Sequence, residues 1–202
     1  MSINVDPVSG AVEVVLPARA SERAAASAVK ELRPWIEKQQ DKALAARQRV
    51  LDRRGTVPYL DETLRLAPES GRTRAHRKGD RLLVPASDPA PAIERYYRRM
   101  AKAEVVPRLD DAVADLGTTY KSVRIAGQRT RWGSCTSAGV MSFNWRLLLA
   151  PERVLDYVIW HEACHLLVLN HSREYWALVE QHVPDYKEAS KWLRTNAATL
   201  VL

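Results

Sequence analysis

The sequence predicts an α+β fold, in which a strand-helix-strand region comes first and a group of three strands followed by helices comes second. Short β-rich runs bounded by Gly and Pro lie on both sides of long segments with helical periodicity. The chain has 202 residues, of which 46% are hydrophobic and 27% are charged, a composition typical of a soluble globular protein with one domain or two small ones.

The first region is expected to open with a β-hairpin. Residues 11–16, Ala-Val-Glu-Val-Val-Leu, are rich in β-branched side chains and are bounded by Gly10 and Pro17. Residues 2–6 can pair with this strand across a turn at residues 7–10. The hairpin therefore precedes the first helical segment.

A helical region follows from Ser21, a suitable N-cap, to about Arg53. Pro34 should interrupt or kink this helix, because proline lacks the backbone N–H that a helix interior needs. Short strands are expected next over residues 57–66 and 81–84, on either side of a loop.

Basic residues crowd into that loop and its edge. They are Arg72, Arg74, His76, Arg77, Lys78 and Arg81. Together with the net charge of +7, they are compatible with a nucleic acid or nucleotide partner, whose phosphates such patches bind. A solvated basic loop explains the same pattern and is the commoner case.

Pro89 and Pro91 favour a boundary between two parts of the chain. The sequence therefore predicts an amino-terminal α+β region over residues 1–89 and a second domain over residues 90–202. The second domain is expected to begin with one amphipathic helix over residues 92–116.

Three strands are expected after this helix, over residues 122–125, 130–135 and 140–147, the last two joined as a hairpin. An apolar helix then starts at Pro151, because proline suits the first turn of a helix. A further helix is expected from the N-cap Ser172.

The apolar helix carries the pattern H-E-x-x-H (HExxH). His161 and His165 are four residues apart, so a helix would place both imidazoles on one face, close enough to share a metal ion. Glu162 lies beside them, where its carboxylate could take a proton from a metal-bound water. A third imidazole, His171, can reach the same ion only if the helix ends and the chain turns back, and Asn170 can adopt the left-handed conformation used in such turns.

The ordinary alternative is a histidine satisfied within the core, because the preceding segment 154–160 is apolar nearly all round. Three of the five histidines and a glutamate, however, lie within residues 161–171, where an unpaired carboxylate would be costly. A metal site is therefore predicted. Cys135 and Cys164 are too few for a disulfide framework and are expected to be reduced.

A series of motifs occurs in one order between residues 121 and 193. They are Arg131-Trp132-Gly133-Ser134-Cys135, Phe143-Asn144-Trp145-Arg146-Leu147, Asp156-Tyr157-Val158, His161-Glu162-Ala163-Cys164-His165-Leu166, Asn170-His171-Ser172 with Tyr175-Trp176, and Pro184-Asp185-Tyr186. In these motifs the chain resembles the YgjP-like metal-dependent hydrolases, which are related to the SprT and WLM zinc metallopeptidases. The amino-terminal half resembles the family in its outline of strands, helix and strands. By that resemblance, this sequence would begin inside the family's first strand.

The resemblance implies a zincin-like catalytic domain, with a small mixed sheet packed on the HExxH active-site helix. It implies that His161, His165 and His171 are ligands of Zn²⁺ and that Glu162 is the general base. The spacing of His171 equals that of the metzincins, but Val168 stands where those proteins have a turn glycine, so the turn must be built differently.

In zincins the strand before the active-site helix lines the cleft and pairs with an extended peptide. The resemblance therefore places Ser142, Phe143 and Asn144, within the strand at residues 141–147, beside the substrate. An ordinary buried strand is the alternative for each of these residues.

The leading functional prediction is a zinc-dependent metallopeptidase acting on a peptide or protein, with Arg131, His182 and Tyr186 as candidates to stabilise the oxyanion. One alternative is a metal-dependent nucleoside triphosphate pyrophosphatase, a label attached to some members of the family. Another is a DNA-associated SprT-like protease. The apolar runs are too short to span a membrane and the amino terminus lacks a signal pattern, so a cytoplasmic location is expected.

Overall fold

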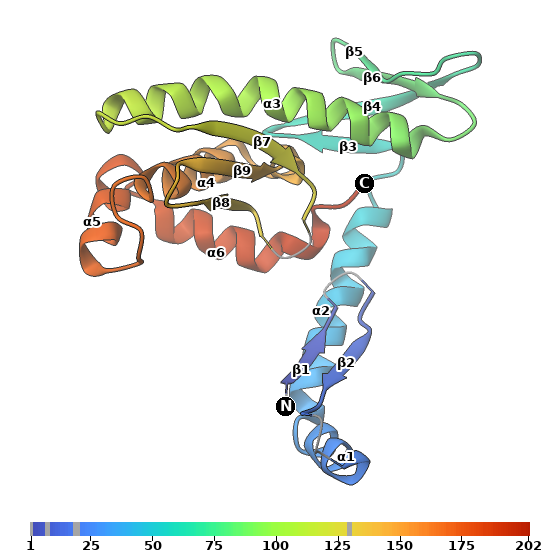
Figure 1. The fold of residues 1–202 in the computed structure, drawn as a ribbon. Coiled ribbons are helices and arrows are strands. Elements are labelled where there is room, and N and C mark those ends of the chain that lie inside the picture. The colour runs from blue at the N-terminus through green and yellow to red at the C-terminus, as the bar shows by residue number, and fades with distance from the viewer. Residues whose placement is uncertain (1, 7–8, 18–20, 129–130) are drawn as a thin grey trace. The chain divides into compact units, whose positions relative to one another are not determined.

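The computed structural model describes residues 2–6, 9–17, 21–128 and 131–202 (Figure 1). The chain divides into two compact units, the first made of Met1–Arg54 with Asn196–Val201 and the second of Gly55–Thr195 with Leu202. The described residues form both helices and small sheets, two of which mix parallel and antiparallel pairing, so the fold is mixed α and β.

The amino-terminal part of the first unit consists of a β-hairpin and two helices. Its elements are β1 (Ser2–Val5), β2 (Val12–Val15), α1 (Glu22–Glu31) and α2 (Arg33–Leu51). The two strands pair antiparallel as predicted, while Pro7 and Val8 of the expected turn lie outside the described residues. Pro34 does interrupt the helical region: it stands in the first turn of α2, where a missing N–H leaves no gap in the hydrogen bonding.

The second unit begins with a four-stranded sheet. Its strands are β3 (Thr56–Tyr59), β4 (Glu62–Glu69), β5 (His76–Lys78) and β6 (Arg81–Pro85), in the order β3-β4-β6-β5. Strands β4 and β6 are parallel, and the other two pairs are antiparallel. The single strand expected over residues 57–66 is two strands, because the chain turns at Leu60, whose φ is 53°.

Two of the basic side chains expected in the loop after β4 are paired with carboxylates. Arg72 lies 2.7 Å from Glu69, and Arg77 lies 2.5 Å from Glu62. These pairs lie near the surface and add little stability. They nevertheless cancel positive charge, so this region offers less attraction to a nucleic acid than its sequence indicates.

Helix α3 (Pro89–Asp115) begins at the predicted domain boundary and contacts β6, β7 and α4 within the second unit (Figure 1). Its Tyr96 and Tyr97 pack against Tyr59 of β3, with ring centroids 6.5 and 5.9 Å apart. Residues 55–88 therefore share a core with α3. The predicted boundary near residue 89 lies inside the second compact unit, and the two units divide after Arg54.

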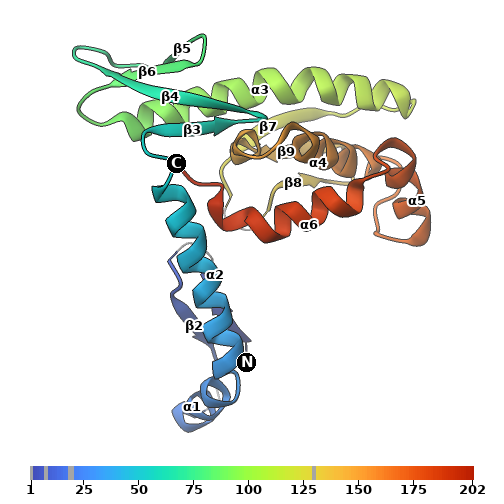
Figure 2. The ribbon, with the colours of Figure 1, turned by 180° about the vertical axis from the view of Figure 1, so that it is seen from behind.

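The rest of the second unit is a three-stranded sheet followed by helices. These elements are β7 (Ser122–Ala126), β8 (Gly133–Cys135), β9 (Val140–Asn144), η1 (Trp145–Leu149), α4 (Glu152–Cys164), α5 (Arg173–His182) and α6 (Tyr186–Asn196). The short η2 (Ala197–Thr199) that follows α6 belongs to the first unit. Strand β9 lies in the centre, parallel to β7 and antiparallel to β8. Helix α4 packs on one face of this sheet. The sheet lies in front of α4 in the view of Figure 1 and behind α4 in the view of Figure 2.

Two of the expected strands have different limits in the structure. The strand expected to reach residue 147 ends at Asn144, because the side chain of Asn144 accepts the N–H of Arg146 at 3.1 Å and starts the 3₁₀ turn η1. The strand expected from Thr130 begins at Gly133, and Thr130 lies outside the described residues. None of the helices in the described ranges is long and apolar enough to cross a membrane.

Candidate metal centre

The two histidines of the HExxH pattern lie at the carboxyl end of helix α4. The apolar side chains of this helix are mostly buried, with Leu155 and Ile159 only 0% and 1% exposed. His161 and Glu162 lie in the last turn, and His165 is the C-cap residue. The rings of the two histidines are 5.1 Å apart, as their spacing on a helix predicts.

The chain reverses direction between His165 and His171. The left-handed conformation expected at Asn170 is not used, since Asn170 is not among the described residues with positive φ. Its side-chain oxygen instead accepts the N–H of Ser172 at 3.2 Å, which closes a turn without backbone strain. Ser172 then caps α5 as predicted, because its hydroxyl accepts the N–H of Tyr175 at 3.3 Å.

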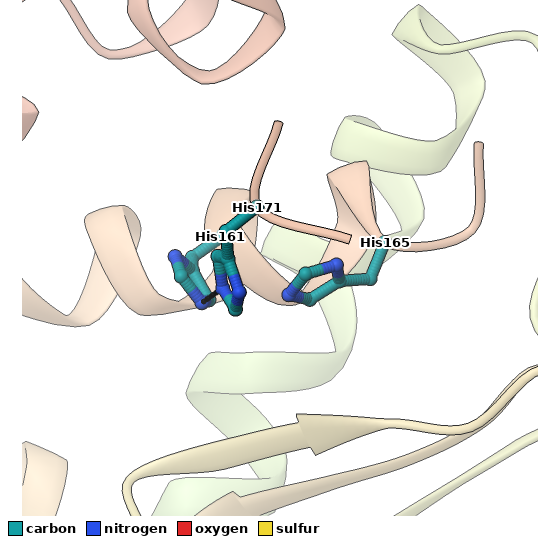
Figure 3. Close-up of side chains that lie close together, drawn as sticks. All are labelled: His161, His165 and His171. Carbon is teal, nitrogen blue, oxygen red and sulfur yellow. Dashed lines mark hydrogen bonds between the residues drawn. The ribbon is translucent and has the colours of Figure 1, made fainter. Parts of the chain in front are cut away.

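This turn brings three imidazole rings together (Figure 3). Candidate ligand atoms of His161, His165 and His171 all lie within 4.8 Å of one another. The Nε2 atoms of His161 and His171 are 3.2 Å apart, and Nδ1 of His165 lies 3.0 Å from the carbonyl oxygen of Val168, which leaves its Nε2 available. Two nitrogen ligands of a tetrahedral zinc ion lie about 3.4 Å apart, given bonds of about 2.1 Å. The donor set and its spacing therefore fit such an ion.

Packing and burial hold the imidazole of His161 in an uncharged state. Its buried Nδ1 has no hydrogen-bond partner in the part of the chain that the structure describes. The rings of Tyr157 and Tyr175 pack against the imidazole ring, with centroids 5.7 and 5.4 Å from its own. Burial, and to a lesser extent the neighbouring His165 and His171, lower the pKa of His161 to about 3. Burial also lowers the pKa of His165. Both rings can therefore offer a lone pair to a metal at neutral pH.

Two aromatic residues at the start of α5 frame the histidines. Tyr175 is fully buried; its ring stacks on that of His165 at 4.4 Å, and its hydroxyl donates to the carbonyl oxygen of His161 at 2.9 Å. The ring of Trp176 stacks on that of His171 at 5.5 Å. Spacing alone does not predict a role for either residue. The available signal is their place in the first turn of the helix that follows the third histidine.

Two of the residues expected to stabilise an oxyanion are engaged in ring stacks. His182 stacks on Trp160 with centroids 4.2 Å apart, and Tyr186 stacks on Trp176 at 5.2 Å. His182 is not a member of the histidine cluster, whereas Tyr186 is linked to the cluster through Trp176, whose ring also stacks on that of His171. Arg131 remains the candidate with an electrostatic connection to the site.

Glu162 is a buried carboxyl group beside the histidines, only 6% exposed. Burial raises its pKa to about 7, although the positive charge of Arg131 acts to lower it. A carboxyl group with a pKa near neutrality is suited both to accept and to return a proton. On the sheet side, Glu162 lies against the backbone of Gly133 in β8.

The substrate positions expected on β9 are buried. Ser142, Phe143 and Asn144 are 3%, 0% and 3% exposed, and β9 is paired on both sides. The side-chain amide of Asn144 donates to the carbonyl oxygens of Gln128 and Arg131 at 2.6 and 3.1 Å, so it holds the segment before β8. These residues cannot take up a peptide strand as expected, because a central strand has no free backbone edge. Among the described strands, β8 forms the edge of this sheet next to Glu162.

The chain is similar in sequence to a family of known proteins. The family model for the YgjP-like metallopeptidase domain matches residues 1–196, a range that reaches into both compact units. None of the curated proteins matches the chain. One similar solved structure is the metallopeptidase zymogen abylysin of Pyrococcus abyssi, which is 26% identical, with a TM-score of 0.42, over 45% of this chain and 92% of that chain.

Proposed function

The chain belongs to the YgjP-like family of metallopeptidases, and from this we propose that it is a zinc-dependent peptidase whose metal is held by His161, His165 and His171. The observation that supports this most is the convergence of three imidazoles beside a buried carboxyl group. Imidazole nitrogens suit zinc, whereas calcium and magnesium take mainly oxygen ligands.

In this proposal Glu162 is the general base. A zinc ion held by the histidines supplies Lewis acidity, which activates water and polarises the carbonyl group of the scissile bond. Glu162 accepts the proton from the water and then donates it to the leaving amine. Arg131, whose charge already acts on Glu162, stabilises negative charge on the carbonyl oxygen.

We further propose that an extended peptide pairs with β8 rather than with β9. Trp132 and Thr136, on either side of β8, form backbone hydrogen bonds to the β9 side at 2.8 and 3.0 Å. Alternate residues of an antiparallel strand direct their N–H and C=O groups to opposite edges, so those of Gly133 and Cys135 point away from β9. A peptide added at that edge would run past Glu162.

The proposal is tested with purified protein carrying one equivalent of zinc, assayed on fluorescein-labelled casein and on a pool of internally quenched peptides. Cleavage is expected, with loss on chelation by 1,10-phenanthroline and recovery on addition of zinc. Glu162→Gln should keep its zinc but lose on the order of 10²-fold or more in turnover, because an amide cannot accept the proton.

Two outcomes would contradict this function. Wild-type turnover in zinc-loaded Glu162→Gln would show that this residue is not the base. Phosphate release from nucleoside triphosphates that is abolished by the same variant, without peptide cleavage, would replace the peptidase by a phosphoanhydride hydrolase.

A further inference from the structure

Glu162 occupies space that any side chain at position 133 would need. A Cβ atom built on Gly133 would lie 2.5 Å from Oε1, 2.6 Å from Cγ and 2.8 Å from Cδ of Glu162. Separations this short lie well inside van der Waals contact. The backbone at Gly133 does not have the positive φ that favours glycine, so the reason for glycine here is space and not conformation.

Strand β8 cannot simply move away to make that space. Trp132 and Thr136, on either side of Gly133, are hydrogen-bonded to the β9 side at 2.8 and 3.0 Å. Gly133 is in register with Phe143, whose side chain is fully buried. The amide of Asn144 holds the preceding segment through the carbonyl oxygen of Arg131. A side chain at position 133 would therefore displace the carboxyl group and not the strand.

We infer that Gly133 is a positioning residue for the reaction: the absence of a side chain there sets where the carboxyl group of Glu162 lies relative to the histidines. This inference rests on the proposed function, in which Glu162 is the general base. It assigns the glycine of the Arg131–Cys135 segment a role that involves neither metal binding nor substrate contact by a side chain. A shift of the carboxyl group by about 1 Å is enough to reduce proton transfer strongly.

The kinetic test uses Gly133→Ala. We expect zinc content and KM on fluorescein-labelled casein to match wild type, while kcat falls by about 10²-fold. Ser134→Ala is the matched control, since it alters the next residue of the same strand, whose side chain points to the other face. This control should keep its kcat. Wild-type kcat in Gly133→Ala, or an equal fall in the control, would overturn the inference.

A thermal unfolding cycle tests the geometry without any assay of activity. Gly133→Ala should lower the melting temperature of the metal-free protein by on the order of 5 °C, because the added methyl group overpacks against Glu162. In a Glu162→Ala background, which lacks Cγ, Cδ and both oxygens, the same substitution should cause no decrease. Equal decreases in the two backgrounds would overturn the inference.

The two experiments separate this inference from the proposed function. Inactive Glu162→Gln together with fully active Gly133→Ala would leave the proposed function standing and reject the role of Gly133. Fully active Glu162→Gln would reject the proposed function and with it any catalytic role of Gly133, even where the thermal cycle shows the expected coupling.

Discussion

The two sides of the candidate centre are held in place by different means. On the side of α4 and α5, aromatic rings hold the histidines, as where Tyr175 stacks on His165. On the side of β8, Glu162 lies against a backbone that carries no side chain at Gly133. Each side depends on different neighbours, so metal binding and proton transfer should respond to different substitutions.

The largest effect is expected on the histidine side. His161→Ala removes one of the three proposed ligands, and we expect zinc affinity to fall by at least about 10³-fold, since loss of a residue that merely orients a ligand costs 10–100-fold. Competition with a chelator, followed by measurement of bound zinc, is the assay. His76→Ala, which alters an exposed histidine of β5, is the matched control. Stoichiometric zinc in His161→Ala would show that zinc binds elsewhere.

The same assay examines the third ligand. His171→Ala should weaken zinc binding to a similar degree, because His171 Nε2 lies 3.2 Å from His161 Nε2. Glu174→Ala and Glu180→Ala should have no effect, because both glutamates are exposed and Glu180 pairs with Lys187 at 3.1 Å. If either glutamate variant released zinc while His171→Ala retained it, the assignment of His171 as the third ligand would be wrong.

On the carboxylate side, burial of Glu162 should reduce the stability of the metal-free protein at alkaline pH. Burial raises its pKa from 4.5 to about 7. A group whose pKa is higher in the folded state favours folding below its unfolded pKa, and this contribution is lost as the pH rises from 4.5 through 7. The free energy of unfolding that is lost in this way amounts to about 3 kcal/mol at pH 8, compared with a pH below the unfolded pKa.

Glu162→Gln carries no charge at any pH, so it should escape this loss. We expect the metal-free variant to exceed wild type in free energy of unfolding by up to about 3 kcal/mol at pH 8 and by little at pH 4.5. His161 has the opposite dependence, because its pKa is lowered and its contribution is lost as the pH falls below 6.5. The contribution of His161 to the free energy of unfolding is the same in wild type and in Glu162→Gln, so it cancels when the two are compared. Equal urea midpoints at pH 8 would contradict the prediction.

The histidine side was more predictable from the sequence than the sheet side, because its geometry is local. The spacing of His161 and His165 on a helix, and the Ser172 cap beyond the turn, are each set within a few residues. The position of β9 is not local: β9 is central because β7, which precedes it by many residues, pairs with it in parallel. No pattern within residues 140–144 indicates which strand lies at the edge.

The domain boundary also could not be predicted from local sequence patterns. Proline-rich segments occur both in linkers and in the first turns of helices, and Pro89 and Pro91 stand in the first turn of α3. The contact that decides between the two cases is the packing of Tyr96 and Tyr97 on Tyr59, far back in the chain. Such a contact leaves no periodic signal around residue 89.

The smallest effect is expected from Trp176→Leu, again on the histidine side. Trp176 stacks on His171, the most exposed of the proposed ligands, at 5.5 Å, and it also stacks with Tyr186 at 5.2 Å. Leucine keeps apolar contact but has no flat face to fix the orientation of the imidazole. Zinc affinity should therefore fall about 10-fold, the low end for a residue that orients a ligand. Turnover of the zinc-loaded variant should not change, because Glu162 is held from the sheet side.

Trp160→Leu is the matched control for this last prediction, because the ring of Trp160 stacks on His182, which lies outside the histidine cluster. It should keep its zinc affinity. If Trp160→Leu and Trp176→Leu lost zinc affinity equally, the effect of Trp176 would be explained by general destabilisation of α5 and not by its stacking on His171. A loss of turnover in zinc-loaded Trp176→Leu with unchanged affinity would show that the two sides of the centre are coupled, because altering a ring against a ligand would then have moved the base.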